Sequence, residues 1–191
     1  MWAQVDNNSV TRIFSHPVPF SIGDNNYPAN TLALWPEADL NALDIWEVVE
    51  DNTNEKDDRY YINTNIIYTY NSETGKVDAA YGTATAKEMD DVTVDGITTE
   101  GLKTIKKELI DRQCAGILKP SDWMVVKATE TGETMDSGWK TWRASVRTKC
   151  NSMQTQIDNA SDVDALAALF TYTKQGDGSY TRPLGEFPEK E

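Results

Sequence analysis

The sequence has few of the residues on which most active sites depend. It contains one histidine, His16, which Pro17 follows directly, and two cysteines, Cys114 and Cys150, with no histidine near them in the sequence. A single imidazole without such neighbours lacks the partners of a metal site or a catalytic base. There is no G-x-S-x-G turn and no glycine-rich phosphate loop. These absences predict a protein that is not an enzyme, with no catalytic residue, no metal site and no cofactor.

Long apolar runs and an excess of positive charge are also missing. No stretch approaches the roughly 18 apolar residues of a membrane helix. The N-terminus lacks the basic region and apolar run of a signal peptide. The formal net charge of −13 would repel phosphates and anionic lipids. We therefore expect a soluble protein, made inside a cell, that binds neither nucleic acid nor a membrane.

The negative charge is concentrated in the first half of the chain. Residues 1–96 contain 17 acidic and 5 basic side chains, a net charge of −12, whereas residues 97–191 contain 14 and 13, a net charge of −1. The second half can therefore approach a partner without strong long-range repulsion. The acidic pairs at 57–58 and 90–91 lack the spacing of a calcium loop, so we interpret them as solvated acids.

The first half has the patterns of short β-strands. Residues 1–20 alternate in polarity around an Asp-Asn-Asn turn, which predicts two strands. A strand is predicted over 45–50, after a helical turn. The stretch 59–70 is rich in tyrosine and isoleucine, and with the return strand 77–86 it predicts a hairpin.

The segments between these strands are polar, and we predict loops over 22–29 and 51–58 and a linker over 87–97. The aromatic residues of this half leave two interpretations open: they pack inside a sheet, or they form a stacking surface for sugars or peptides. They are Trp35, Trp46, Tyr60, Tyr61, Tyr68 and Tyr70.

The second half has helical periodicity. From residue 98 or 99, a first helix is predicted by the spacing of Leu102, Ile105, Leu109, Gln113 and Ile117. Pro120 ends this helix, and the Ser121 hydroxyl is expected to cap a second helix over 122–129.

The third helix has the clearest pattern, an apolar stripe at three- and four-residue spacing. Its members are Trp139, Trp142, Val146, Cys150, Met153, Ile157 and Ala160. Residues 161–164 are close to a capping box and predict a last helix over 163–170. Arg143 and Arg147 lie on the flank of the stripe, where they are solvated, pair with Asp122 or Glu130, or face a partner.

Together these patterns predict an α+β fold, with a small antiparallel β region followed by a C-terminal helical hairpin or bundle. We assign residues 1–96 to a β-rich domain, 97–173 to a helical domain and 174–191 to a loose tail. Cys114 and Cys150 are expected to be buried thiols, with a disulfide between their helices as the alternative.

The helical region carries a motif with a leucine-rich helix, an (S/T)DW helix start and a (W/Y)R-x-x-(V/L/I)R helix. The residues that form it are Ile117-Leu118, Ser121-Asp122-Trp123, Val126-Lys127-Ala128, Trp142-Arg143-Ala144 and Val146-Arg147. This pattern resembles the C-terminal region of bacteriophage tail-fibre assembly proteins and related phage tail proteins. The N-terminal stretches MWAQVDNNSVTRIF and LDIWEVVED are similar to the β module that often precedes it.

The resemblance implies a non-enzymatic role, either as a chaperone for a tail fibre or as a structural component at the fibre or baseplate. Its partner would be a tail-fibre or baseplate protein, and it would act in the host cytoplasm during assembly or stay in the virion tail. Trp123, Arg143 and Arg147 are the candidate partner-binding residues. The alternative function is a glycan-binding module for host recognition that uses the aromatic strands.

Overall fold

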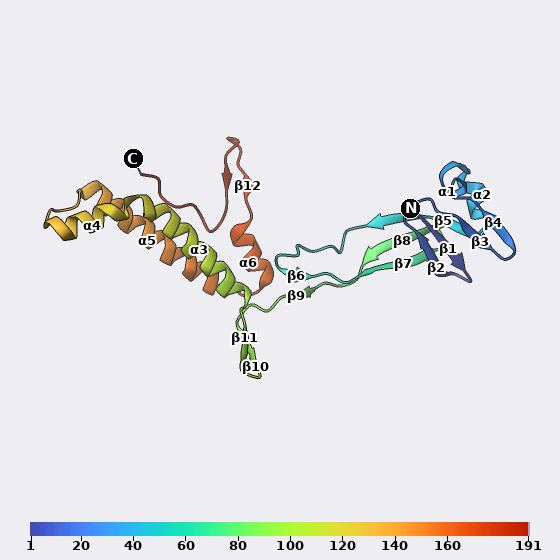
Figure 1. Cartoon of the computed structure of the whole chain (residues 1–191), viewed down its shortest axis with the longest axis horizontal. Helices are drawn as coiled ribbons and strands as arrows, with labels where there is room; N and C mark the ends of the chain where they lie inside the picture. Colours follow the sequence, from blue (N-terminus) through green and yellow to red (C-terminus); the bar gives the residue numbers. More distant parts are fainter. Residues whose placement is uncertain (191) are drawn as a thin grey trace. The chain divides into compact units, whose positions relative to one another are not determined.

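The computed structural model describes residues 1–190, and the chain divides into two compact units, Met1–Thr85 and a second that begins at Ala86. Figure 1 shows short strands in the first unit and the long helices in the second. The predicted α+β fold is confirmed: β-sheets come first, and helices packed on one another follow.

The first unit combines a mixed five-stranded sheet with two short helices. The elements up to the central strand are β1 (Trp2–Asp6), β2 (Ser9–Phe14), β3 (Phe20–Ile22), β4 (Asn25–Tyr27), α1 (Thr31–Leu34), α2 (Glu37–Asn41) and β5 (Ile45–Asp51). The elements that follow are β6 (Tyr61–Ile62), β7 (Ile66–Asn71), β8 (Lys76–Tyr81) and β9 (Thr85–Ala86). The predicted β1–β2 hairpin is present, with Asn7 and Asn8 at positive φ in its turn.

The sheet has the strand order β2-β1-β5-β8-β7. All its pairs are antiparallel except β5 with β8, where Val48 lies opposite Val77 in a parallel register. The chain leaves β5 through a long loop and runs back along β7, so β8 points the same way as β5. The sheet curls, and its edge strands β2 and β7 contact each other.

Two apolar clusters hold this unit together, and their residues alternate along the strands as the period of a strand requires. One cluster lies on the concave face of the sheet and is formed by Ala3, Val5, Val48, Val77 and Ala79. The other joins the opposite face to the α1–α2 segment and is formed by Phe14, Phe20, Leu32, Leu40 and Ile45.

Several segments differ from the sequence prediction, including the return strand predicted over 77–86, which is regular only at β8 and β9. The predicted loop 22–29 includes most of a small hairpin, β3–β4, whose turn has Gly23 at φ 56°. The predicted strand 59–70 is regular only at β6 and β7. The predicted linker 87–97 contains β10 (Val92–Val94), which pairs with β11 (Ile97–Thr99). Asp95 and Gly96 both have positive φ, as the tight turn of this hairpin demands.

The second unit is built on two long antiparallel helices. Its helices are α3 (Leu102–Leu118), the 3-10 turn η1 (Lys119–Ser121), α4 (Asp122–Thr131), α5 (Ser137–Asp158) and α6 (Val163–Phe170). A last hairpin is formed by β12 (Thr173–Lys174) and β13 (Tyr180–Thr181). α6 has the predicted bounds, and the Asp162 carboxylate caps it by accepting the Ala165 amide at 2.8 Å.

Packing of α3 on α5 forms the core of this unit. The predicted stripe of α5 is largely confirmed, with Val146, Cys150, Met153 and Ile157 buried on one face. The stripe predicted for α3 is wrong after Leu102. The buried residues are Leu102, Ile110, Cys114 and Leu118, whereas Ile105 and Gln113 are exposed. The actual stripe is displaced by one residue because α3 carries apolar side chains on more than one face.

The segment after β13, which was expected to be part of a loose tail, lies along α5. The side chain of Leu184 is fully buried. The Lys149 ammonium donates to the Leu184 carbonyl at 2.9 Å, and the Trp142 indole donates to the Pro188 carbonyl at 3.0 Å. The Lys190 ammonium lies over the Trp139 ring, 5.4 Å from its centroid. These contacts bind residues 184–190 to one face of α5.

Candidate partner-binding site

Among the helices described in the second unit, α4 has the most exposed large apolar residues. Four large apolar side chains follow one another at its start, Trp123 to Val126, yet none of its residues is buried. The side chain of Trp123 is 59% exposed and that of Val126 is 54% exposed. A ten-residue helix is marginal in water by itself. The stability of α4 therefore depends on contacts that hold its ends and on contacts that cover its apolar face.

Arg143 anchors the start of α4 from inside the protein. The residue is only 5% exposed. Its guanidinium donates to the Leu118 carbonyl at 2.9 Å and to the Ser121 hydroxyl, and it pairs with the Asp122 carboxylate at 2.7 Å. A buried guanidinium needs such partners, because an unpaired buried charge is costly. Arg143 therefore fixes α5 to the junction between α3 and α4.

The Ser121 hydroxyl does not cap α4 as the sequence predicted. It donates to the Leu118 carbonyl at 2.8 Å and accepts from Arg143. The turn at Pro120 instead continues from α3 into α4 through η1, and the Asp122 amide at the start of α4 donates to the Lys119 carbonyl. The Ser121 hydroxyl therefore binds the Arg143 guanidinium and does not cap a helix.

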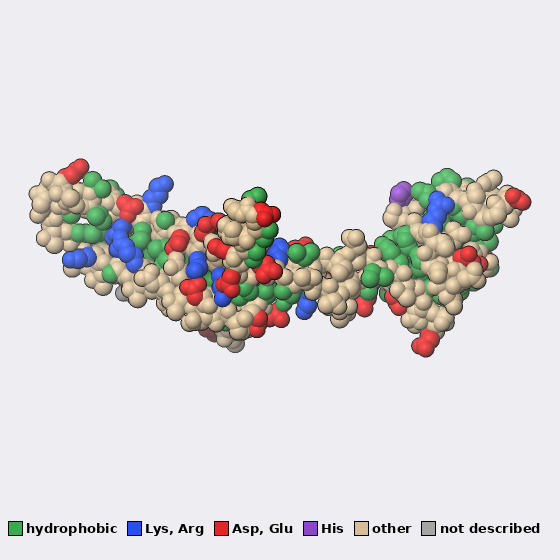
Figure 2. All heavy atoms as spheres, turned by 90° about the horizontal axis from the view of Figure 1, so that it is seen from below, with side chains coloured by type: hydrophobic (Ala, Val, Ile, Leu, Met, Phe, Trp, Pro, Cys, Tyr) green, Lys and Arg blue, Asp and Glu red, His purple; other side chains and the backbone are tan. Residues whose placement is uncertain are grey.

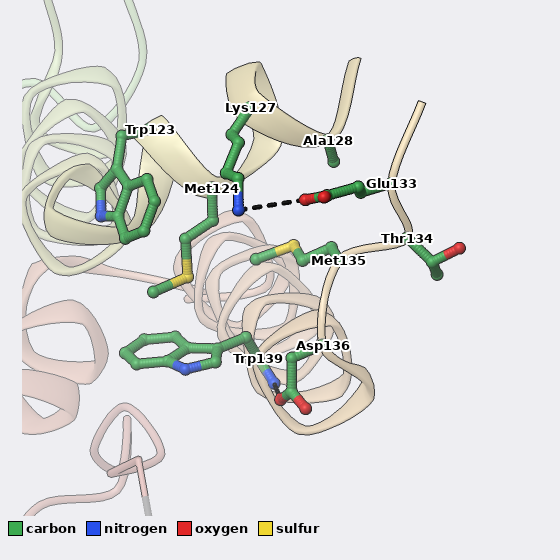
Figure 3. Close-up of a pocket in the computed structure, with 9 residues that line it drawn as sticks. All are labelled: Trp123, Met124, Lys127, Ala128, Glu133, Thr134, Met135, Asp136 and Trp139. Atoms are coloured by element: carbon green, nitrogen blue, oxygen red, sulfur yellow. Dashed lines mark hydrogen bonds and ion pairs between the residues drawn. The ribbon is translucent and has the colours of Figure 1, made fainter. Parts of the chain in front are cut away.

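An apolar pocket lies on one side of α4, between that helix and the start of α5. Figure 3 shows Trp123, Met124, Met135 and Trp139 pointing toward one another in this pocket, which we call the tryptophan pocket. Its volume is about 330 Å³. An ion pair of 3.0 Å between Lys127 and Glu133 borders it. Two indoles and two flexible thioethers make a surface that adapts to apolar side chains of different shape.

A second depression, which we call the cationic groove, lies on the other side of α4 and has a volume of about 380 Å³. Its lining consists of Val125, Ala128, Thr129, Thr134, Met135, Lys140, Arg143 and Arg147. The lining includes three cations and no carboxylate. Figure 2 shows basic and apolar side chains interspersed over this end of the second unit.

The three residues that the sequence singled out for partner binding have different environments. Trp123 is exposed and lines the tryptophan pocket, and Arg147 is exposed and lines the cationic groove. Arg143 departs from the expectation that it faces a partner, because its guanidinium is buried in contacts within the chain. Its alternative pairing with Asp122 is confirmed. Burial of an arginine against a backbone carbonyl leaves no local signal in the sequence.

Sequence reasoning missed Met124, Met135 and Lys140 as parts of this site. The run of four apolar residues in a short helix was the available signal, since such a helix cannot bury all of them on a single neighbour. Met135 precedes α5, outside any periodic pattern, and only the fold brings it next to α4.

The aromatic residues of the first unit mostly pack within it. Tyr60 is buried, and Trp46, Tyr68 and Tyr70 pack against the concave cluster of the sheet. The rings of Trp46 and Tyr70 are 5.1 Å apart at their centroids. Trp35 is the more exposed exception, and it meets Tyr27 edge to face. This arrangement supports the packing interpretation over a continuous stacking surface.

The two cysteines are buried free thiols in the interface between α3 and α5. Burial, together with the neighbouring Cys114 thiol and the Asp111 carboxylate, raises the pKa of the Cys150 thiol to about 12. The Cys150 thiol donates to that carboxylate at 3.5 Å. A thiol held in its protonated form is a poor nucleophile.

No group of three or more histidine, cysteine, aspartate or glutamate side chains within residues 1–190 is placed to hold a metal ion. Over the same residues, no helix has both the length and the hydropathy to cross a bilayer. Comparison of the chain with protein families, curated proteins and solved structures found no significant match.

Proposed function

We propose that this chain is a non-enzymatic bacteriophage tail protein that binds a fibre or baseplate protein. It acts either as a tail-fibre assembly chaperone or as a structural component associated with the fibre or baseplate. The observation that carries this proposal is α4, a helix with four large apolar residues and no buried one, flanked by two depressions. An apolar helical surface of this kind is typical of a protein-binding site.

The contacts of Arg143 give a physical reason for residues of the phage-like motif to occur together. Two parts of the motif, Ser121-Asp122 and Arg143, are direct partners across the helical hairpin. Their contacts hold the α3–α4 junction on α5 and leave Trp123, between them in the motif, facing outward. The motif residues therefore hold one exposed tryptophan at the anchored start of a helix. This supports a binding role for the region that resembles the phage module.

The proposed partner is a tail-fibre or baseplate protein, met in the host cytoplasm during assembly. A tryptophan that is more than half exposed is suited to this role, because tryptophan is prominent among the residues that dominate binding energy at interfaces. A chaperone would leave the fibre after folding, and a structural component would remain in the virion tail.

Co-expression with a tail-fibre protein of the same phage tests the proposal. We expect the two proteins to co-purify and the yield of trimeric fibre to rise. Trp123→Ala should weaken the complex by roughly 2 kcal/mol, or about thirtyfold. Tyr180→Ala, at a residue 60% exposed on the last hairpin, is the matched control and should leave binding unchanged.

The proposal fails if the fibre trimerises equally well without this chain and no complex forms. Mass spectrometry of purified particles separates the two roles, since only a structural component is retained in stoichiometric amounts.

A further inference from the structure

We propose that the cationic groove binds a short amphipathic helix of a partner protein, which carries two carboxylates seven residues apart on either side of an apolar residue. This helix would lie against α4 and α5 as the third member of a bundle. The identification of the partner as a fibre or baseplate protein rests on the proposed function. The chemistry of the bound segment rests on the groove alone.

The apolar part of the argument begins where α3 ends. Up to Leu118, α3 covers the buried face of α5, but beyond it the hairpin consists of α4 and the first turns of α5. Two helices cannot bury an apolar stripe on each other as completely as three can. Val125 is 41% exposed at the edge of the groove, and Ala128 and Met135 continue its apolar floor. An apolar side chain of a third helix would cover this floor.

The charge of the groove indicates which charged residues of the third helix would flank that apolar side chain. Arg143 is already neutralised by Asp122. Lys140 and Arg147 are exposed, and neither side chain has an ion pair or a hydrogen bond to any of residues 1–190. The two cations are seven residues apart on α5, which places them on nearly the same face about 10 Å apart along the axis. Two carboxylates at the same spacing on a facing helix would meet both.

The charge around the groove also favours an acidic partner segment, because it differs in sign from the net charge of the whole chain. Residues 117–149 carry six basic and four acidic side chains, a net charge of +2, in a chain whose net charge is −13. A second copy of the chain is the alternative occupant, and the net charge of −13 on each copy opposes it. α4 spans ten residues, or about 15 Å, so a helix of roughly equal length suffices.

The test uses the full chain and a labelled synthetic helical peptide of about 14 residues, with two glutamates seven apart and a leucine between them. The same peptide with both glutamates replaced by glutamine is the neutral probe. Fluorescence anisotropy measures binding of each. We expect the glutamate peptide to bind at least about tenfold more tightly at low salt, with the difference shrinking as salt increases.

Charge-reversal variants locate the binding site. Lys140→Glu and Arg147→Glu should each weaken binding of the glutamate peptide by roughly fivefold to tenfold. Lys174→Glu makes the same change of charge at an exposed residue of β12 and should have no effect. The proposal is overturned if the two peptides bind equally, if neither binds, or if Lys174→Glu weakens binding as much as the groove variants do. It is also overturned if sedimentation shows a dimer that Lys140→Glu dissociates, because the occupant is then a second copy.

The co-expressed fibre protein separates this inference from the proposed function. If the fibre complex forms with the wild-type chain and persists in the Lys140→Glu, Arg147→Glu double variant, the groove inference is wrong and the proposed function stands. If no fibre complex forms but the glutamate peptide binds as expected, the proposed function is wrong and the groove inference stands.

Discussion

Replacement of Arg143 by alanine should destabilise the helical unit more than any exposed substitution near it. The change removes two hydrogen bonds of known length, one to the Leu118 carbonyl at 2.9 Å and one to Asp122 at 2.7 Å, and a third to Ser121. A hydrogen bond that involves a charged group contributes about 1.5 to 3 kcal/mol. The Leu118 carbonyl keeps its bond from the Ser121 hydroxyl, so no buried acceptor is left unpaired. The Asp122 side chain is mostly exposed and adds little, so we count only the two bonds to the buried partners Leu118 and Ser121. At the lower limit of about 1.5 kcal/mol each, we expect a loss of about 3 kcal/mol.

The control for this prediction is Asp122→Asn, which removes the charge of one partner. The Asp122 side chain is 57% exposed, so water replaces much of what the ion pair provides. We expect that variant to lose less than about 1 kcal/mol. The contrast between the two variants distinguishes an internal anchor from an ordinary surface ion pair.

Urea denaturation followed by far-ultraviolet circular dichroism measures both variants, because the long helices belong to the second unit. With a slope of about 2 kcal/mol per molar urea, a loss of 3 kcal/mol moves the midpoint by about 1.5 M. A midpoint for Arg143→Ala within about 0.3 M of the wild type would refute the reasoning. So would a loss in Asp122→Asn as large as that in Arg143→Ala.

Three further predictions concern a thiol, a glycine and a helix cap. Burial is the largest cause that raises the pKa of the Cys150 thiol in the folded chain, and it persists in the Cys114→Ala variant. A thiolate-dependent reagent at about pH 8 should therefore label that folded variant far more slowly than the urea-unfolded one. In the wild-type chain, the pKa of the Cys150 thiol is higher in the folded than in the unfolded state. The contribution of this thiol to the free energy of unfolding is therefore complete below about pH 9 and should be lost as the pH rises toward 12, which a denaturation series across that range measures. Gly101→Ala would place a Cβ atom 2.4 Å from the backbone carbon of Asp90, and we expect a loss of about 2 kcal/mol or more by urea denaturation. The Asp136 carboxylate accepts the amide three residues later at 3.1 Å and caps α5, so Asp136→Ala should cost about 1 kcal/mol, with no change in peptide binding if the groove keeps its shape.

The elements that the sequence predicted well are those with purely local determinants. The two asparagines between β1 and β2 adopt positive φ as a tight turn requires, and Asp162 caps α6 from the position that its side chain favours. The stripe of α5 follows from its own spacing, because a single face of that helix carries its large apolar residues. In each case the determinants lie within a few residues of the structure they specify.

The features that were missed depend on residues distant in the sequence. The direction of β8 relative to β5 is set by the whole path of the chain between them, not by the composition of either strand. The buried face of α3 is selected by the shape of α5, since Ile105 and Ile110 are equally apolar and only Ile110 is buried. Arg143 is inside because a carbonyl and a hydroxyl at the end of another helix receive it. Of the exposed residues that line the two depressions beside α4, the sequence singled out only Trp123 and Arg147 for the same reason.

The position of β5 in the sheet has a consequence for the order in which the first unit folds. β1 with β2, and β7 with β8, are hairpins between neighbours in sequence, and each can form before the rest of the sheet exists. β5 pairs with one strand from each hairpin, and its parallel pairing with β8 closes a long connection. Closure of that connection costs entropy that neither hairpin has to overcome alone. Docking of β5 is therefore expected to be the slow event, in which two independently formed halves become one sheet.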